Sequence, residues 1–167
     1  MCRIGIGEEI SLIYTIGYEG LTIGEFTDIL KAHAIKILVD VRELPLSRKR
    51  GFSKNILSNA VEDVGIEYIH KRELGAPREV RHALRRTDDW VAYCTAYEKV
   101  LKINQESLIS LSKLSNSSRV CLMCFEEDYK ACHRSLITER MIAIGLTKSV
   151  SHLNPRKEKA DLMGLNA

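Results

Sequence analysis

The sequence predicts a single-domain α/β fold, a mostly parallel sheet of about four or five strands with helices on both faces. Three observations predict it. Short apolar runs such as residues 35–41 are nearly continuous, which is typical of strands buried on both faces of a sheet. These runs alternate with helix-length amphipathic segments through short connections. The chain has 167 residues, the length of one domain with a sizeable core.

The first third of the chain predicts two strands around one helix. Residues 12–17 are an apolar run that ends in glycine, as expected of a buried strand. Thr22 and Glu25 have the spacing of a capping box, so a helix should span residues 23–33. The β-branched run 35–41 is the second strand.

The middle of the chain predicts a loop, a helix and a third strand. Residues 42–53 are a basic loop. Residues 54–64 carry apolar side chains every three or four positions, so they predict a helix, which Gly65 ends. Residues 66–70 alternate like a short strand, and residues 71–80 are predicted to be irregular because they contain glycine and proline.

The second half predicts further helices and strands. A long helical region should begin at Thr87 or Asp88 and reach about residue 114, with a break near residues 104–105. After it we expect a strand, a helix and a strand at residues 119–124, 132–144 and 148–153. Residues 1–153 should form the α/β domain, and residues 154–167 a polar tail with at most a short terminal helix.

Cysteine usage and hydropathy indicate a reduced protein without a membrane span. Five cysteines, an odd number, are scattered along the chain, which argues against a disulfide framework. No apolar run approaches the roughly 20 residues of a membrane span. The first residues lack the apolar core of a secretory signal. We therefore expect a cytoplasmic location and no membrane partner, while the oligomeric state is open.

The net charge is only +3, but the basic residues gather in two clusters. The first lies between Arg42 and Lys54, and the second between Lys71 and Arg86. Both fall in segments predicted as loops or as helix starts near loops. Such clusters are often no more than solvated surface, and they are also what attracts phosphate groups.

The carboxyl ends of the predicted strands hold the candidate site residues, because ligands of open parallel sheets bind outside these ends. Each of the first four strands ends in polar or reactive side chains. Catalytic roles are expected for Asp40, Cys124 and His133. Ligand-binding roles are expected for Tyr18, Glu19, Arg42, Arg48, His70, Cys132 and Arg134.

The stretch from Cys124 to Arg134 is the most informative of these. It leads from a strand end through an acidic loop to a helix start, where backbone N–H groups and partial positive charge collect. A thiol there should have a lowered pKa, so Cys124 is the candidate nucleophile. His133 is suited to proton transfer, and Arg134 to bidentate phosphate binding. The alternatives are a buried small side chain for Cys124 and a surface ion pair for Arg134.

The same stretch contains three residues of types that bind metal ions, Cys124, Cys132 and His133. A structural zinc site usually needs four ligands at recognisable spacing. Cys121 does not complete the set, because side chains three residues apart in a strand point to opposite faces. We therefore expect no metal and no cofactor, with a metal on these three residues as the alternative.

The other strand ends carry weaker signals. Asp40 and Arg42 share one face of a strand, where they suit a structural ion pair as well as catalysis. Tyr18 and Glu19 lie between two glycines that allow close approach of a ligand, and a lone histidine such as His70 is more often structural. One predicted helix face carries aromatic residues that favour core packing over a base-stacking platform: Trp90, Tyr93 and Tyr97.

Four ordered motifs resemble the domain-of-unknown-function 488 family. They are Thr15-Ile-Gly-Tyr-Glu-Gly20, Val39-Asp-Val-Arg42, Ile66–His70 with Glu73–Gly75, and Cys121–Cys124 with Cys132-His-Arg-Ser135. The resemblance covers about residues 13–145, most of the chain. It implies a small α/β cytosolic protein of prokaryotic type, without an assigned reaction.

Residues 38–43 are also similar to the Asp-Val-Arg strand of rhodanese-like domains, which carry a strand-end cysteine, a loop, an arginine and a helix. Cys124 would then be the nucleophile and Arg134 the arginine. The loop between them is longer than in rhodaneses. Its acidic residues would raise the pKa of the thiol and repel an anionic sulfur donor.

The favoured function is therefore binding of, or action on, a phosphate-bearing ligand at the carboxyl edge of the sheet. A nucleotide or a nucleic acid is the expected ligand class. A rhodanese-like sulfurtransferase using Cys124 and a non-catalytic interaction module are the alternatives. The sequence leaves open whether the protein is an enzyme.

Overall fold

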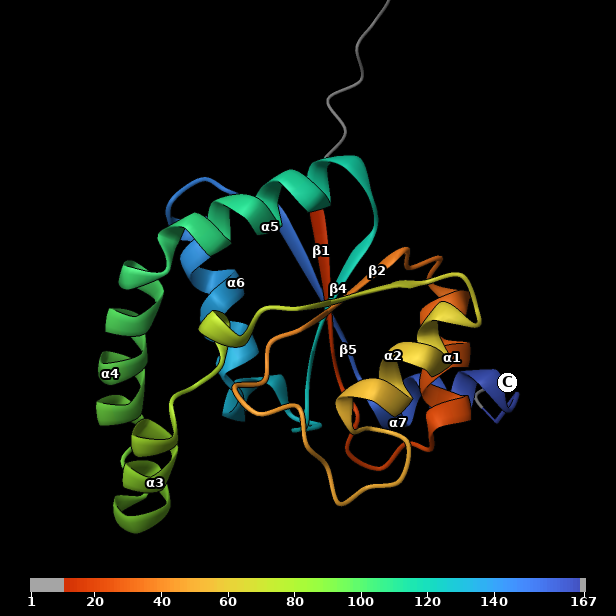
Figure 1. Ribbon diagram of the computed structural model, residues 1–167, viewed down its shortest axis with the longest axis horizontal. Coiled ribbons are helices and arrows are strands. Elements are labelled where there is room, and N and C mark those ends of the chain that lie inside the picture. Colours follow the sequence, from red (N-terminus) through yellow and green to blue (C-terminus); the bar gives the residue numbers. More distant parts are fainter. Residues whose placement is uncertain (1–10, 166–167) are drawn as a thin grey trace, which may run out of the picture.

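The computed structural model describes residues 11–165, which form a five-stranded sheet between two groups of helices (Figure 1). The strands are β1 (Leu12–Gly17), β2 (Ile37–Asp40), β3 (Glu67–His70), β4 (Val120–Cys124) and β5 (Ser149–Leu153). All neighbouring strands pair in parallel, in the order β3-β2-β4-β1-β5. The predicted α/β class and parallel sheet are confirmed.

The helices cover both faces of this sheet (Figure 1). They are α1 (Ile23–Ala32), α2 (Lys54–Glu62), α3 (Arg78–Thr87), α4 (Trp90–Ile103), α5 (Gln105–Ser117), α6 (His133–Ala143) and α7 (Pro155–Leu162). Helices α1 and α2 pack on one face, and α4, α5 and α6 pack on the other. None of the helices within residues 11–165 combines the length and the apolar character that crossing a bilayer requires.

Side chains of each strand alternate between two separate cores, which explains the nearly continuous apolar runs. Val39 and Leu122 face α4, α5 and α6, whereas Leu38 and Met123 face α1 and α2. Cys121 likewise lies in the core beneath α1 and α2, while β4 ends with Cys124 in the opposite core, as the strand geometry predicted.

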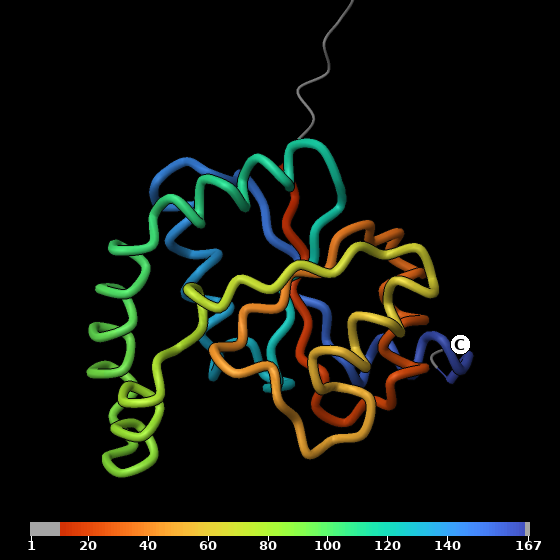
Figure 2. The backbone as a smooth tube through the Cα atoms, in the orientation of Figure 1, coloured from red at the N-terminus to blue at the C-terminus, as the bar shows by residue number. Residues whose placement is uncertain are grey.

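The strand register aligns the carboxyl ends of the strands. Gly17 lies opposite Cys124, and Asp40 lies opposite both Met123 and His70. Figure 2 shows that the loops after β1, β2 and β4 emerge together, at the end of the sheet away from the start of β1. The segments that carry the candidate residues therefore meet at one edge.

Helix α3 was not predicted from the sequence, which indicated an irregular segment over residues 71–80. None of its residues is fully buried, and its short apolar stripe, Val80, Ala83 and Leu84, lies among charged side chains. It packs on α4, with partly buried Val80 and Leu84 against the core. Asp88, in the left-handed conformation with φ of 52°, separates the two helices.

The segment expected as a polar tail contains α7. Asn154 caps this helix by accepting a hydrogen bond from the backbone of Lys157, and a proline occupies the first turn. Helix α7 docks on α1, where Lys159 pairs with Glu25 at 2.8 Å. The folded unit therefore extends beyond residue 153.

Candidate functional site

A cleft of about 620 Å³ opens at the carboxyl edge of the sheet, and we call it the basic cleft. The loop after β2, the α3–α4 segment and the loop after β4 surround it. Its basic side chains are Arg42, Arg48, Lys49, Arg81 and Arg85, and its aromatic side chains are Tyr18, Trp90, Tyr93 and Phe125. Cys124, Glu126 and His133 also line it, so the basic cleft reaches the end of β4.

Asp40 and Arg42 form a buried ion pair at the end of β2. The Asp40 carboxylate, which has no exposed surface, accepts from Arg42 Nε at 2.9 Å and Nη2 at 2.6 Å. It also accepts from the Tyr68 hydroxyl at 2.6 Å. Burial disfavours the guanidinium, but the Asp40 carboxylate outweighs this and raises the pKa of Arg42. Asp40, predicted to be catalytic, is thus occupied with positioning Arg42.

Arg42 links this ion pair to the wall of the basic cleft. Its Nη1 donates to the Tyr18 hydroxyl at 3.0 Å and to the Phe52 carbonyl at 2.9 Å. The Tyr18 ring stacks on Phe52 with centroids 4.3 Å apart. Tyr18 and Arg42 therefore form a fixed part of the wall.

Two thiols and one imidazole converge behind the basic cleft. The Nδ1 atom of His133 lies 3.7 Å from Cys124 Sγ and 3.9 Å from Cys132 Sγ. All three residues are buried, and their ligand atoms lie within 4.8 Å of one another. Cys124 Sγ also donates to the Glu126 carboxylate at 3.1 Å. We call Cys124, Cys132 and His133 the thiol–imidazole cluster.

The charges in this cluster differ from the sequence expectation. The hydrogen bond with Cys132, together with burial and the Glu126 carboxylate, raises the pKa of Cys124 well above its ordinary value. Burial also opposes ionisation of Cys132, but the hydrogen bond from Cys124 and nearby His133 outweigh it and lower the pKa of Cys132. The expected low pKa of Cys124 is therefore wrong, and the lowered pKa is that of Cys132.

The pKa of His133 is raised, because the Cys132 charge outweighs the burial that disfavours an imidazolium. The pKa of Glu126 is raised by burial and by the same Cys132 charge. A thiolate beside an imidazolium can act as a nucleophile with a proton donor, or can bind a metal ion after losing protons.

Arg134 holds the loop after β4 instead of lining the basic cleft. It is fully buried, and its two Nη atoms donate to the carbonyls of Glu126 and Glu127. Gly17 packs on the same loop, where a Cβ atom would collide with the Glu126 carbonyl. The ligand-binding role expected for Arg134 therefore gives way to an anchoring role.

Glu19 and His70 also lie outside the basic cleft. Glu19 accepts a hydrogen bond from the Glu127 backbone at 2.9 Å and borders a separate pocket beside His152. His70 Nε2 lies 2.8 Å from the carbonyl oxygen of Arg42, so it supports the loop after β2. Of the predicted site residues, the structure gathers Tyr18, Arg42, Arg48, Cys124 and His133 on the cleft wall, with Cys132 behind them.

The segment that contains these elements matches a family model. The model, described as a domain of unknown function, DUF488, matches residues 22–141, well over half of the chain. The chain belongs to the DUF488 family. The match includes β2, β4 and the Cys132-His-Arg stretch, so the resemblance seen in the sequence is confirmed. No curated protein and no solved structure shows a significant match to the chain.

Within the DUF488 match, α3 and α4 supply cleft residues that the sequence did not assign to the site. Arg81 and Arg85 come from α3, and Trp90 stacks on Tyr93 with centroids 4.8 Å apart. The sequence does contain features that could have identified these residues, namely the second basic cluster and two aromatic residues three positions apart. Nothing local in the sequence brings α3 to the loops after β2 and β4.

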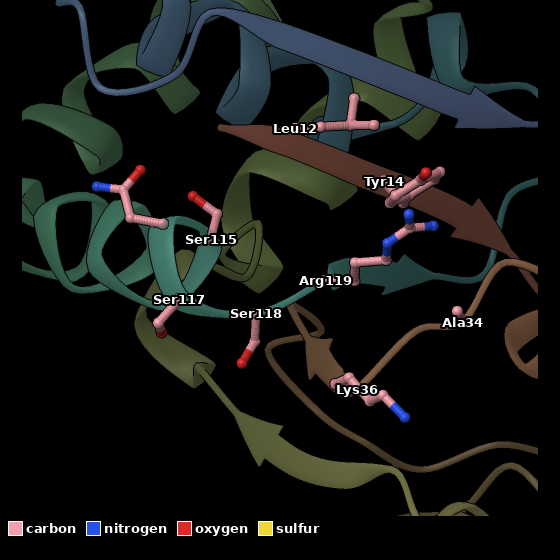
Figure 3. A pocket seen from close by; sticks show the side chains of 9 residues that line it. Leu12, Tyr14, Ala34, Lys36, Ser115, Ser117, Ser118 and Arg119 are labelled. Atoms are coloured by element: carbon pink, nitrogen blue, oxygen red, sulfur yellow. The ribbon is translucent and has the colours of Figure 1, made fainter. Parts of the chain in front are cut away.

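A second pocket of about 500 Å³ lies at the opposite edge of the sheet (Figure 3). Lys36 and Arg119 border it together with serines at the end of α5 and Tyr14 from β1. None of the predicted site residues lines it. The predicted site residues of this DUF488 chain therefore lie away from this pocket.

Proposed function

We propose that this DUF488 protein binds a phosphate-bearing ligand, a nucleotide or a nucleic acid, in the basic cleft. The observation that supports this is that five cationic side chains and four aromatic rings line one concave surface. Cationic side chains attract phosphates, and aromatic rings stack on bases.

The cationic side chains differ in how free they are to meet a ligand. Arg42 is bound to Asp40, and Arg81 donates to Glu43 at 2.6 Å and to the Ala76 carbonyl. Arg48 and Arg85 are exposed, and within residues 11–165 their side chains make no hydrogen bond or ion pair. Lys49 is partly buried, and within the same residues its side chain also makes no hydrogen bond or ion pair. We assign the main phosphate contacts to the two exposed arginines, Arg48 and Arg85.

Two charge reversals test this proposal. Arg48→Glu and Arg85→Glu should each weaken binding of a short fluorescent single-stranded oligonucleotide or of ATP by about tenfold at low salt, about 1.4 kcal/mol. Fluorescence anisotropy measures the first ligand and calorimetry the second. The wild-type affinity for the oligonucleotide should fall steeply as salt is added. Binding of the protein releases counterions from the phosphates, and added salt makes this release less favourable.

The chain provides matched controls. Arg50 and Arg86 are exposed arginines in the same segments, two residues and one residue from the tested positions, and neither lines the basic cleft. Arg50→Glu and Arg86→Glu should therefore weaken binding much less. Equal losses in all four variants, or no binding by the wild type, would contradict the proposal.

A rhodanese-like sulfurtransferase with Cys124 as nucleophile has less support. The Cys124 thiol donates to the Glu126 carboxylate, and its raised pKa disfavours a thiolate. The acidic side chain beside it would also repel an anionic sulfur donor.

A further inference from the structure

The thiol–imidazole cluster has the composition of a metal site. It is the one group of three or more cysteine, histidine, aspartate or glutamate residues in the described chain, 11–165, with ligand atoms close enough to hold an ion. Two sulfur atoms and one imidazole nitrogen form a set that selects zinc over magnesium or calcium. Cys124 and Cys132 come from opposite ends of the loop after β4, and the fold brings them together.

The distances within the cluster fit a tetrahedral zinc ion. Zinc binds sulfur at about 2.3 Å and nitrogen at about 2.1 Å. At the tetrahedral angle, these bond lengths place a sulfur ligand and a nitrogen ligand roughly 3.6 Å apart. The observed distances from His133 Nδ1 to the two sulfur atoms are 3.7 and 3.9 Å. The imidazole therefore lies at a suitable distance from both sulfur atoms, and all three ligand atoms lie within 4.8 Å of one another.

The surroundings orient His133 as a ligand. Its Nε2 donates to the Val41 carbonyl at 2.8 Å, which leaves Nδ1 directed at the two thiols. A backbone carbonyl on the second ring nitrogen is the usual partner of a metal-bound histidine. The Tyr97 ring packs edge-on against the imidazole, with centroids 5.5 Å apart. The ring is thus held in place by groups that do not themselves bind a metal.

We propose that Cys124, Cys132 and His133 bind a zinc ion whose fourth position faces the basic cleft. Cys124 and His133 both line the basic cleft, so the side of the ion away from the protein opens towards it. Three protein ligands with one open position are typical of catalytic zinc, whereas structural zinc is closed by four. Glu126 lies beside the Cys124 ligand and lines the same surface. Binding of the ion releases to solvent every thiol proton on Cys124 and Cys132, together with the Nδ1 proton of His133 when the imidazole is protonated.

The zinc content of the reduced, full-length protein tests this proposal. Purified wild type should contain one zinc ion per chain by plasma mass spectrometry, or should take up one after treatment with chelator and added zinc. Replacement by cobalt should produce a thiolate-to-cobalt charge-transfer band and the intense visible bands of a tetrahedral ion. This measurement on the wild type does not depend on how any variant folds.

Variants identify the ligands. Cys124→Ala, Cys132→Ala and His133→Ala should each weaken zinc binding more than about tenfold. Cys121→Ala, which removes a buried thiol of the same strand on the opposite face, and Cys94→Ala should retain the ion. Reduced wild type that binds no stoichiometric zinc and gives no charge-transfer band overturns the proposal, as does zinc retained by both Cys124→Ala and Cys132→Ala. Zinc binding is independent of the phosphate ligand, so either proposal can fail alone.

Discussion

Replacing Asp40 with alanine should lower the free energy of unfolding by about 3–5 kcal/mol, because it leaves a buried guanidinium without its counter-ion. The Arg42 side chain is 7% exposed, and it keeps only the Tyr18 hydroxyl and the Phe52 carbonyl as partners. Tyr68 loses its acceptor as well. Urea unfolding followed by circular dichroism measures the loss.

The companion variants separate lost charge pairing from loss of a side chain. Asp40→Ala combined with Arg42→Met should cost less than the sum of the two single changes, because no unpaired buried charge is left. Asp28→Ala is the matched surface control, since Asp28 pairs with Lys31 at 3.5 Å and both side chains are more than half exposed. It should change the stability by less than about 1 kcal/mol. A similarly small loss of unfolding free energy for Asp40→Ala would contradict the prediction, because it would mean that buried Arg42 is stable without its counter-ion.

Arg134→Met should destabilise the protein by about 2–4 kcal/mol, because two charge-assisted hydrogen bonds are lost and two loop carbonyls are left without a donor. Methionine replaces most of the volume, so the effect reports on the hydrogen bonds more than on a cavity. The backbone of residues 126–131 should exchange hydrogen for deuterium faster, because Arg134 holds the carbonyls of Glu126 and Glu127. Mass spectrometry after exchange locates the change.

Arg119→Met is the matched control for this substitution. Arg119 is an exposed arginine that donates to one carbonyl, that of His33, at 3.2 Å. Its loss should have a small effect on stability and none on the loop after β4. The opposite result would be an Arg134→Met variant with unchanged stability and unchanged hydrogen exchange in the loop after β4, but without oligonucleotide binding. Arg134 would then be a ligand contact.

Arg42 and Arg134 show why a ligand in the basic cleft would be bound mainly by other cations. Arg42 and the two Nη atoms of Arg134 donate to groups of the protein itself. The cations left for a ligand, Arg48, Lys49 and Arg85, lie on two separate segments. The thiol–imidazole cluster lies at the inner end of the same surface, so a ligand held by these cations would have its nearest reactive groups there.

The sequence by itself determined the strands of the sheet and predicted which edge of it carries the candidate residues. Nearly continuous apolar runs located β1, β2 and β4, since a strand covered on both faces needs apolar side chains in both directions. The alternation of residues 66–70 predicted β3, and residues 148–153 were expected as the last strand. The parallel arrangement then placed Gly17, Asp40, His70 and Cys124 at one edge. Strand periodicity alone separated Cys121 from Cys124.

Only the tertiary structure decided what each of these residues does there. Arg134 and Arg85 look alike in the sequence, but one is buried against a loop and the other faces the cleft. The pKa of Cys124 is raised and that of Cys132 is lowered, and the buried Glu126 carboxylate, which accepts from Cys124, contributes to the rise. Helix and strand periods depend on residues a few positions apart, whereas burial and pKa depend on segments that meet only in the folded chain.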